Sequence, residues 1–382
     1  MQFFHLSDLH IGKQLHHYNL KEDQKTVLGE VVDYARELHP DAILIAGDIY
    51  DKSVPSAEAV TVFDEFLTDI SMITPTIPVL LISGNHDSAE RLRYSAGFLK
   101  KHQIYLAGSA PKTKDEWMEK VTLTDEYGTV NIYLLPFLKP SYVRNVFDEA
   151  PESYSDAVKM LIERENIDWS ERNILVSHQF YTGSTMPETC DSETISVGGI
   201  DNVDVSAVED FDYVALGHLH GKQSVKESHI RYPGTLLKYS VSEFGHEKTL
   251  TMVTLGAKGS EAEIREFPIH PLRDVKKKKG CLADILAEEA GGKCDDYVSI
   301  TLTDEIDPYR PKEQLEKVYS RILEVRMDNQ RTRKKMSEFE EELTMKDPFE
   351  AFEDFYEEMQ GRPLEDEELE FMRTIFEQAG EE

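Results

Sequence analysis

Five short runs of apolar residues each end directly at a polar motif whose side chains are good metal ligands. The motifs are Asp8–His10, Gly47–Asp51, Gly84–Asp87, Ser177–His178 and Gly217–His220. Apolar runs of this length, such as 41–47 and 213–217, are typical of β-strands that are covered on both faces. Open α/β sheets bind their ligands at the carboxyl ends of their strands. The pattern therefore predicts an α/β fold in which the five motifs gather at one edge of a sheet.

The first 85 residues alternate between strand and helix signals. Strands are expected at 1–7, 41–47 and 77–83, and apolar residues at helical spacing predict helices within 19–38 and 60–70. This βαβαβ order indicates a parallel sheet with right-handed crossovers.

The order of elements changes later in the first 270 residues. A helix is expected at 89–100 and an antiparallel pair of strands at 121–124 and 130–135. Buried strands are expected again at 173–177 and 213–217, and two last strands, at 229–232 and 250–255, are expected to close the sheet.

A change of composition at 271–280 marks a domain boundary. We therefore expect domains at 1–272, 273–330 and 331–382. The middle domain is a small α+β module with a helix at 282–290, a strand at 297–302 and an apolar stripe from Leu315 to Val325. The lysine run 276–279 is interpreted as a solvated linker rather than a DNA-contacting stripe.

The last segment predicts two amphipathic helices separated by Gly361–Pro363. Its apolar positions are Phe349, Phe352, Phe355, Tyr356, Met359, Leu369, Met372 and Phe376. Burying one such side chain is worth about 1.5–3 kcal/mol, and a hairpin this short does not bury two aromatic faces against itself. We expect these faces to bind a partner; the alternative is packing against the rest of the chain.

Charge and composition exclude several classes of protein. The 382 residues carry a formal net charge of −31, which disfavours nucleic-acid binding through a broad basic surface. Residues 336–382 hold 18 acidic and 3 basic residues, so 3 − 18 = −15 of that charge lies in this segment. No apolar stretch is long enough to span a membrane, no signal peptide is recognisable, and three distant cysteines predict neither disulfides nor a zinc site. A cytoplasmic protein is expected.

The five motifs supply carboxylates, an amide and imidazoles, a set suited to a pair of transition-metal ions. Two divalent ions bring +4 and the carboxylates of Asp8 and Asp48 return −2, so the local field near +2 would attract a phosphodiester. Hydrolysis of a phosphate ester is the chemistry that this set favours. His5, inside an apolar run, is interpreted as a packed histidine rather than a ligand.

The order and spacing of the motifs resemble the calcineurin-like metallophosphoesterase superfamily over the first ~245 residues. Within it, the sequences of 7–12, 47–56, 84–88, 217–221 and 232–235 resemble the branch of SbcD-type nuclease subunits. The resemblance implies a β-sandwich flanked by helices, followed by a small α+β capping domain and a C-terminal helical hairpin.

The resemblance also implies a role for each motif residue. One metal ion would be held by Asp8, His10, Asp48 and His220, and the other by Asp48, Asn85, His178 and His218. His86 would face the scissile phosphate, with the carboxylate of Asp51 orienting it and Asp87 as the competing candidate. The family favours two Mn²⁺ ions.

The function that the resemblance implies is an Mn²⁺-dependent DNA nuclease, a 3′→5′ double-strand exonuclease and a single-strand and hairpin endonuclease in DNA repair and recombination. It would act with an SbcC-type ATPase bound to the C-terminal helices, in a heterotetramer with a nuclease dimer. Two alternatives remain: a small-molecule or cyclic-nucleotide phosphodiesterase with the same dinuclear site, and an assembly scaffold whose metal site is vestigial.

Overall fold

The computed structural model describes residues 1–193, 201–289, 292–334 and 348–379. Its contacts divide the chain into two compact units. The first consists of Met1–Lys277 with Asp295–Ser299, and the second of Lys278–Cys294 with Ile300–Glu382.

The first unit is built on two six-stranded sheets. The first sheet has the order β16-β15-β1-β4-β5-β6. Its strands are β1 (Gln2–Leu6), β4 (Ala42–Ala46), β5 (Val79–Ile82), β6 (Ile104–Ala107), β15 (Thr249–Thr254) and β16 (Glu263–Pro268). Strands β1, β4, β5 and β6 are parallel, whereas β15 is antiparallel to both β1 and β16.

The second sheet has the order β13-β14-β12-β9-β8-β7. Its strands are β7 (Glu119–Asp125), β8 (Gly128–Leu135), β9 (Arg172–His178), β12 (Tyr213–Gly217), β13 (Gln223–Val225) and β14 (Glu227–Tyr232). The four central strands are parallel, and the two edge strands are antiparallel to their neighbours.

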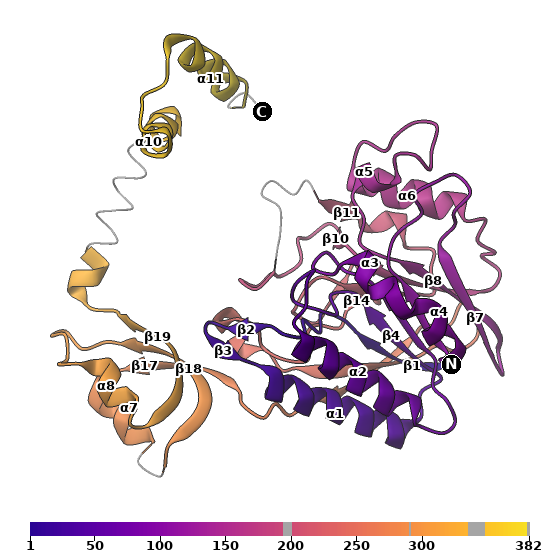
Figure 1. The fold of residues 1–382 in the computed structure, drawn as a ribbon, viewed down its shortest axis with the longest axis horizontal. Helices are drawn as coiled ribbons and strands as arrows, with labels where there is room; N and C mark the ends of the chain where they lie inside the picture. The colour runs from indigo at the N-terminus through magenta and orange to yellow at the C-terminus, as the bar shows by residue number, and fades with distance from the viewer. Residues whose placement is uncertain (194–200, 290–291, 335–347, 380–382) are drawn as a thin grey trace. The chain divides into compact units, whose positions relative to one another are not determined.

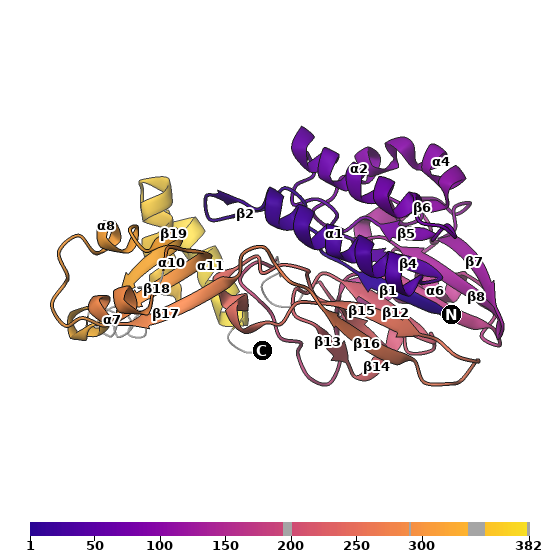
Figure 2. The same cartoon turned by 90° about the horizontal axis from the view of Figure 1, so that it is seen from below.

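The two sheets pack face to face, with helices on their outer faces (Figures 1 and 2). The core between them joins Phe3 and Leu44 of the first sheet to Ile132 and Ala215 of the second. Helices α1 (Lys21–Leu38) and α2 (Ala57–Ser71) lie side by side over the first sheet. Helix α6 (Tyr154–Arg164) packs on the outer face of the second sheet, and together they form a second apolar core. The short helix α5 (Pro140–Val143) contributes to the same core. Covering on both faces explains why β4 and β5 consist of apolar residues alone.

The expected strands at 1–7, 41–47, 77–83, 173–177 and 213–217 are confirmed, and so are helices α1 and α2. The predicted helix at 89–100 is instead broken into α3 (Ala89–Leu92), η1 (Arg93–Ser95), α4 (Ala96–Leu99) and η2 (Lys100–His102). The two closing strands belong to different sheets, since β14 pairs with β12 and β15 pairs with β1.

Several short elements complete the first unit. They are β2 (Gln14–Leu15), β3 (Tyr18–Asn19), β10 (Phe180–Thr182), β11 (Asn202–Asp204), η3 (Val205–Ala207) and η4 (Val241–Gly245). His5 is fully buried and bonds the Tyr213 hydroxyl at 2.9 Å and the Leu216 carbonyl at 3.0 Å, which confirms that it is a packed histidine.

The region after Pro271 forms a small α+β arrangement. A three-stranded sheet has the order β17-β18-β19, with β17 at Val275–Gly280, β18 at Cys294–Leu302 and β19 at Tyr319–Met327. Helices α7 (Leu282–Glu288) and α8 (Pro311–Leu315) accompany it. The lysine run 276–279 is therefore part of a strand and not a linker. Most of the stripe from Leu315 to Val325 is also strand, because only its first residue lies in α8.

The two predicted C-terminal helices are present as α10 (Pro348–Gln360) and α11 (Asp366–Ala379). Phe349 and Phe352 each place their ring centroid 5.6 Å from that of Phe376. Phe355 and Met359 remain 58% and 65% exposed. Tyr356, Leu369 and Met372 are partly buried. In the part of the chain that the structure describes, no helix is both long and apolar enough to cross a membrane.

Candidate metal centre

The five predicted motifs meet where the two sheets face each other. Strands β1, β4 and β5 of the first sheet lead into Asp8, Asp48 and Asn85. From the second sheet, β9 ends at His178 and β12 leads into His218. Main-chain hydrogen bonds from Asp8 N to Gly47 O (3.0 Å) and from His10 N to Asp48 O (2.9 Å) tie the first two loops together.

Four of the predicted ligands have left-handed backbone conformations, which non-glycine residues rarely adopt. Their φ angles are 52° for Asp8, 42° for His10, 49° for Asp48 and 114° for His218. Such strain persists where the surrounding structure enforces it, and it clusters at functional sites.

Glycines next to the ligands allow the loops to approach one another. A Cβ atom at Gly84 would lie 2.1 Å from the Asp48 carboxylate, and one at Gly217 would lie 1.8 Å from the Ala46 carbonyl oxygen. Any side chain at either position would push two ligand loops apart. The glycines of the motifs are therefore a steric requirement of the site.

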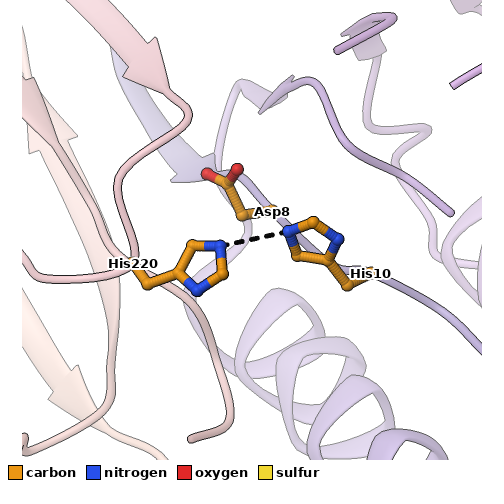
Figure 3. Close-up of side chains that lie close together, drawn as sticks. All are labelled: Asp8, His10 and His220. Atoms are coloured by element: carbon orange, nitrogen blue, oxygen red, sulfur yellow. Dashed lines mark hydrogen bonds between the residues drawn. The ribbon is translucent and has the colours of Figure 1, made fainter. Parts of the chain in front are cut away.

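Asp8, His10 and His220 form one group whose ligand atoms lie within 4.8 Å of one another (Figure 3). Nε2 of His10 and Nε2 of His220 face each other at 3.1 Å, although 210 residues separate them in sequence. Asp8 also accepts hydrogen bonds from His218 N, at 3.1 and 3.0 Å, which fixes its carboxylate.

The tautomer of His220 follows from its contacts. Ser192 Oγ lies 2.7 Å from both Nδ1 of His220 and the carboxylate of Glu243. Burial raises the pKa of Glu243, but Lys248 and His220 outweigh it and hold it well below its ordinary value. A carboxylate only accepts, so Ser192 donates to Glu243 and accepts from the Nδ1–H of His220. Nε2 of His220 is then a bare lone pair directed at the site.

A second group of ligand atoms gathers around Asn85. Nδ1 of His178 donates to the Ala46 carbonyl at 2.7 Å, and Nε2 of His178 lies 2.9 Å from Oδ1 of Asn85 and 3.5 Å from the Asp48 carboxylate. Nδ1 of His218 lies 3.2 Å from the same Asn85 oxygen. Acceptor atoms that converge in this way require a proton or a cation between them.

Burial and neighbouring charges shift the pKa values of the ligands. Burial lowers the pKa of His218 to about 3 and that of His10 well below its ordinary value, so both imidazoles are neutral at pH 7. Burial also lowers the pKa of His178, but Asp48 and Asp8 outweigh it and raise the value to about 9. Burial raises the pKa of Asp48, whereas His178 and His10 reverse this effect and keep it ionised.

His86 lies beside the ligands and is held by main-chain contacts. Its N–H donates to the Asp48 carboxylate at 2.9 Å, and its Nδ1 lies 2.9 Å from the carbonyl oxygen of Asp51. The predicted orienting residue is thus in place, but its carbonyl rather than its carboxylate makes the contact. The Asp51 carboxylate instead pairs with Lys13 at 2.8 Å.

Asp87, the competing candidate, does not contact the His86 ring through any hydrogen bond in the described residues. Its carboxylate accepts three main-chain N–H groups, from Ile49 at 3.0 Å, Tyr50 at 2.9 Å and Gly84 at 2.9 Å. Burial, and then Asp48, raise its pKa to about 7. Asp87 therefore joins the loops after β4 and β5.

Sequence reasoning missed the residues that hold His220 in place through hydrogen bonds. Besides Ser192 and Glu243, they are Glu193, which accepts from His220 N at 2.5 Å, and Lys248, which donates to His220 O at 3.0 Å. These residues lie outside the strand-end motifs and do not share a spacing pattern. Only the fold reveals that they meet.

The residues fit a pair of divalent metal ions. Among the buried atoms in the described parts of the chain, Nδ1 of His10 and Nε2 of His218 lack hydrogen-bond partners. Neutral imidazoles, carboxylates and an amide oxygen are ligands for Mn²⁺, Fe²⁺, Co²⁺ or Zn²⁺ rather than Ca²⁺. The nitrogens that face the other candidate ligands are Nε2 of His10, Nε2 of His220 and Nδ1 of His218.

Comparisons with known proteins agree with this geometry. A profile of the calcineurin-like phosphoesterases matches residues 1–222, and a profile of the type 5 capsule protein repressor C-terminal domain matches residues 268–360. The chain is 34% identical over 329 residues to the SbcD subunit of the SbcCD nuclease of Staphylococcus epidermidis, a match that covers 85% of this chain and 84% of that protein. The chain belongs to the SbcD family of calcineurin-like phosphoesterases.

More distant similarities are found among solved structures. A putative 5′-nucleotidase from Staphylococcus aureus has a TM-score of 0.37 at 12% identity, covering 72% of this chain and 54% of that one. A dimetal phosphatase from Danio rerio has a TM-score of 0.37 at 14% identity, covering 70% and 99%. Membership of the SbcD family makes the chain a metallophosphoesterase, and the expected sandwich flanked by helices is confirmed.

Proposed function

We propose that this protein is an Mn²⁺-dependent DNA nuclease, a 3′→5′ double-strand exonuclease and a single-strand and hairpin endonuclease. The observation that supports it most is the convergence of the seven predicted ligands in a chain of the SbcD family, whose S. epidermidis relative is named as part of a nuclease. Asp8, His10, Asp48 and His220 would hold one ion. Asp48, Asn85, His178 and His218 would hold the other.

When bound, the two ions would lower the pKa of a water molecule and neutralise negative charge on the phosphoryl oxygens. The residues of the chain supply orientation and proton transfer. The Asp51 carbonyl only accepts, so Nδ1 of His86 carries a proton and Nε2 is left for the substrate. His86 would stabilise the scissile phosphate or protonate the leaving oxygen.

The C-terminal helices would bind an SbcC-type ATPase in DNA repair and recombination, within a heterotetramer that contains a nuclease dimer. The exposed Phe355 and Met359 support this proposal, because apolar side chains left in water mark interaction surfaces. We assign 1–272 to the nuclease domain, 273–330 to a cap and 331–382 to partner binding.

A panel of substrates tests the proposal. The protein would be given linear duplex DNA, a DNA hairpin, a cyclic nucleotide and a chromogenic phosphomonoester, with Mn²⁺ or with EDTA. We expect cleavage of both DNA substrates with Mn²⁺ and none with EDTA. Cleavage of the small substrates alone would favour the alternative, a nucleotide phosphodiesterase, with which the net charge of −31 agrees.

A variant of His86 tests the mechanism. His86→Ser should abolish DNA cleavage while the bound Mn²⁺ measured by mass spectrometry stays at the wild-type level, because His86 acts on the substrate. His102→Ser, at an exposed histidine, is the matched control. Loss of Mn²⁺ from the His86 variant would show that His86 is a ligand instead.

A further inference from the structure

A cavity of about 700 Å³ adjoins the second group of metal ligands and is not used by the mechanism above. Asn85 and His218 form part of its wall. A phosphate bound between the ligand groups would therefore have one of its ester substituents next to this cavity. The volume lies within the range of small-molecule sites, about 300–1,000 Å³.

Another part of the wall carries three aromatic side chains, Phe137, Tyr142 and Tyr154. Phe137 is anchored by a hydrogen bond from its N–H to the Ser83 carbonyl at 3.0 Å. Tyr154 packs with one side against the second apolar core. Tyr142, on α5, is 52% exposed and is absent from that core. The aromatic surface that remains lines the cavity.

The lining of the cavity carries two lysines, Lys112 and Lys139, beside three acidic residues, Asp87, Glu90 and Asp201. Lys139 precedes α5 and is exposed, and it has no carboxylate within ion-pair distance among the residues that the structure describes. The second lysine of the lining, Lys112, lies 3.9 Å from Glu90. In a chain with a net charge of −31, an unpaired lysine beside a metal site is suited to a phosphate.

We propose that this cavity binds one unpaired nucleotide of the substrate, with its base against Tyr142 and Tyr154 and its neighbouring phosphate at Lys139. Aromatic side chains stack on any base, and a nearby cation binds the backbone, which is the chemistry of single-stranded nucleic-acid sites. The inference rests on the proposed function, because it places a phosphodiester at the metal ligands. It adds where the adjoining nucleotide lies.

Equilibrium binding separates the cavity from the metal site. The Mn²⁺-loaded protein would be titrated with a deoxynucleoside monophosphate and, separately, with inorganic phosphate. Tyr142→Ala should weaken nucleotide binding by about 5- to 150-fold, the range for loss of one stacked base, and leave phosphate binding unchanged. Tyr94→Ala is the matched control, since Tyr94 is 91% exposed and lies outside the cavity lining.

Lys139→Ala provides a second, independent test. Because Lys139 would bind the phosphate next to the stacked nucleotide, the change should weaken binding of a dinucleotide more than that of a mononucleotide. The difference should shrink at high salt. The inference is overturned if Tyr142→Ala binds the nucleotide as Tyr94→Ala does, or if the wild-type protein prefers inorganic phosphate. Nucleotide binding that depends on Tyr142 without any cleavage of DNA would uphold the cavity and refute the nuclease proposal.

Discussion

The candidate metal centre and the C-terminal helices differ in how far their side chains are buried. At the centre, Asp8, His10, Asp48 and His178 are at most 2% exposed and contact other parts of the same unit. On α10, Phe355 and Met359 are more than half exposed. The first region is completed by its own chain, whereas the second leaves apolar surface in water.

This difference separates what the chain does alone from what it needs a partner to do. The strained loops of the centre are held by strands of two packed sheets, so their geometry exists before any ligand arrives. The aromatic contacts between α10 and α11 involve Phe349, Phe352 and Phe376 and leave the outer positions uncovered. We therefore expect substitutions at the centre and on α10 to affect different measurements.

The largest effect is expected at Asp48, whose carboxylate lies 3.7 Å from Nε2 of His10, in one proposed ligand set, and 3.5 Å from Nε2 of His178, in the other. Asp48→Ala should reduce DNA cleavage by several orders of magnitude and lower the Mn²⁺ content measured by mass spectrometry, because both ions would lose a ligand. Asp64→Ala, at an exposed carboxylate on α2, is the control. A variant that keeps two equivalents of Mn²⁺ would contradict the shared role of Asp48.

A smaller effect at the same centre is expected from Ser192→Ala. The change removes the hydroxyl that links His220 to Glu243, and loss of such a supporting contact typically weakens metal affinity about 10- to 100-fold. The measurement is Mn²⁺ affinity by calorimetry. Ser240→Ala removes another hydroxyl from Glu243, 3.1 Å away, without touching His220. Equal losses in both variants would mean that the contact to His220 is not what matters.

Changes on α10 are expected to have the smallest effect on the metal content and the thermal stability of the first unit. Combining Phe355→Glu with Met359→Glu should weaken capture of an SbcC-type ATPase by about 30-fold or more, the loss typical of a hot-spot residue. Mn²⁺ content and the midpoint of thermal unfolding should stay at wild-type values. Tyr309→Glu, at a tyrosine that is 78% exposed outside these helices, is the control. Unchanged capture would refute partner binding through α10.

The sequence predicts that the candidate ligands meet, because each of the five motifs follows a buried strand. Those strands are recognisable as apolar runs, and a sheet brings their ends together whatever the length of the connections. The contact of His86 with the Asp51 carbonyl was not predictable, since a main-chain atom has no sequence signature. Ser192 and Glu243 were missed for a related reason, because they meet through irregular loops.

Outside the centre, short segments were interpreted less well. Tyr319, Ile322 and Leu323 are buried in the strand β19. Their spacing does not predict this strand, because short apolar runs do not distinguish helix from strand by spacing alone. The lysines at 276–279 lie on β17, at one edge of its sheet. Charged side chains, lysine above all, protect edge strands from pairing with other chains, so a basic run is compatible with a strand there.

The position of β1 in its sheet means that β1 completes its strand pairing late in synthesis. Phe3 pairs with Ala42 on one side and with Val253 on the other, so one flank of β1 stays open until roughly 250 more residues have been made. At about 5–20 residues per second, that interval lasts on the order of 10–50 s on the ribosome. During this interval His10 has been made and His220 has not, so the nascent chain contains only part of each of the two proposed ligand sets. Both proposed ligand sets are therefore complete only after His220 has been made and the first unit has folded.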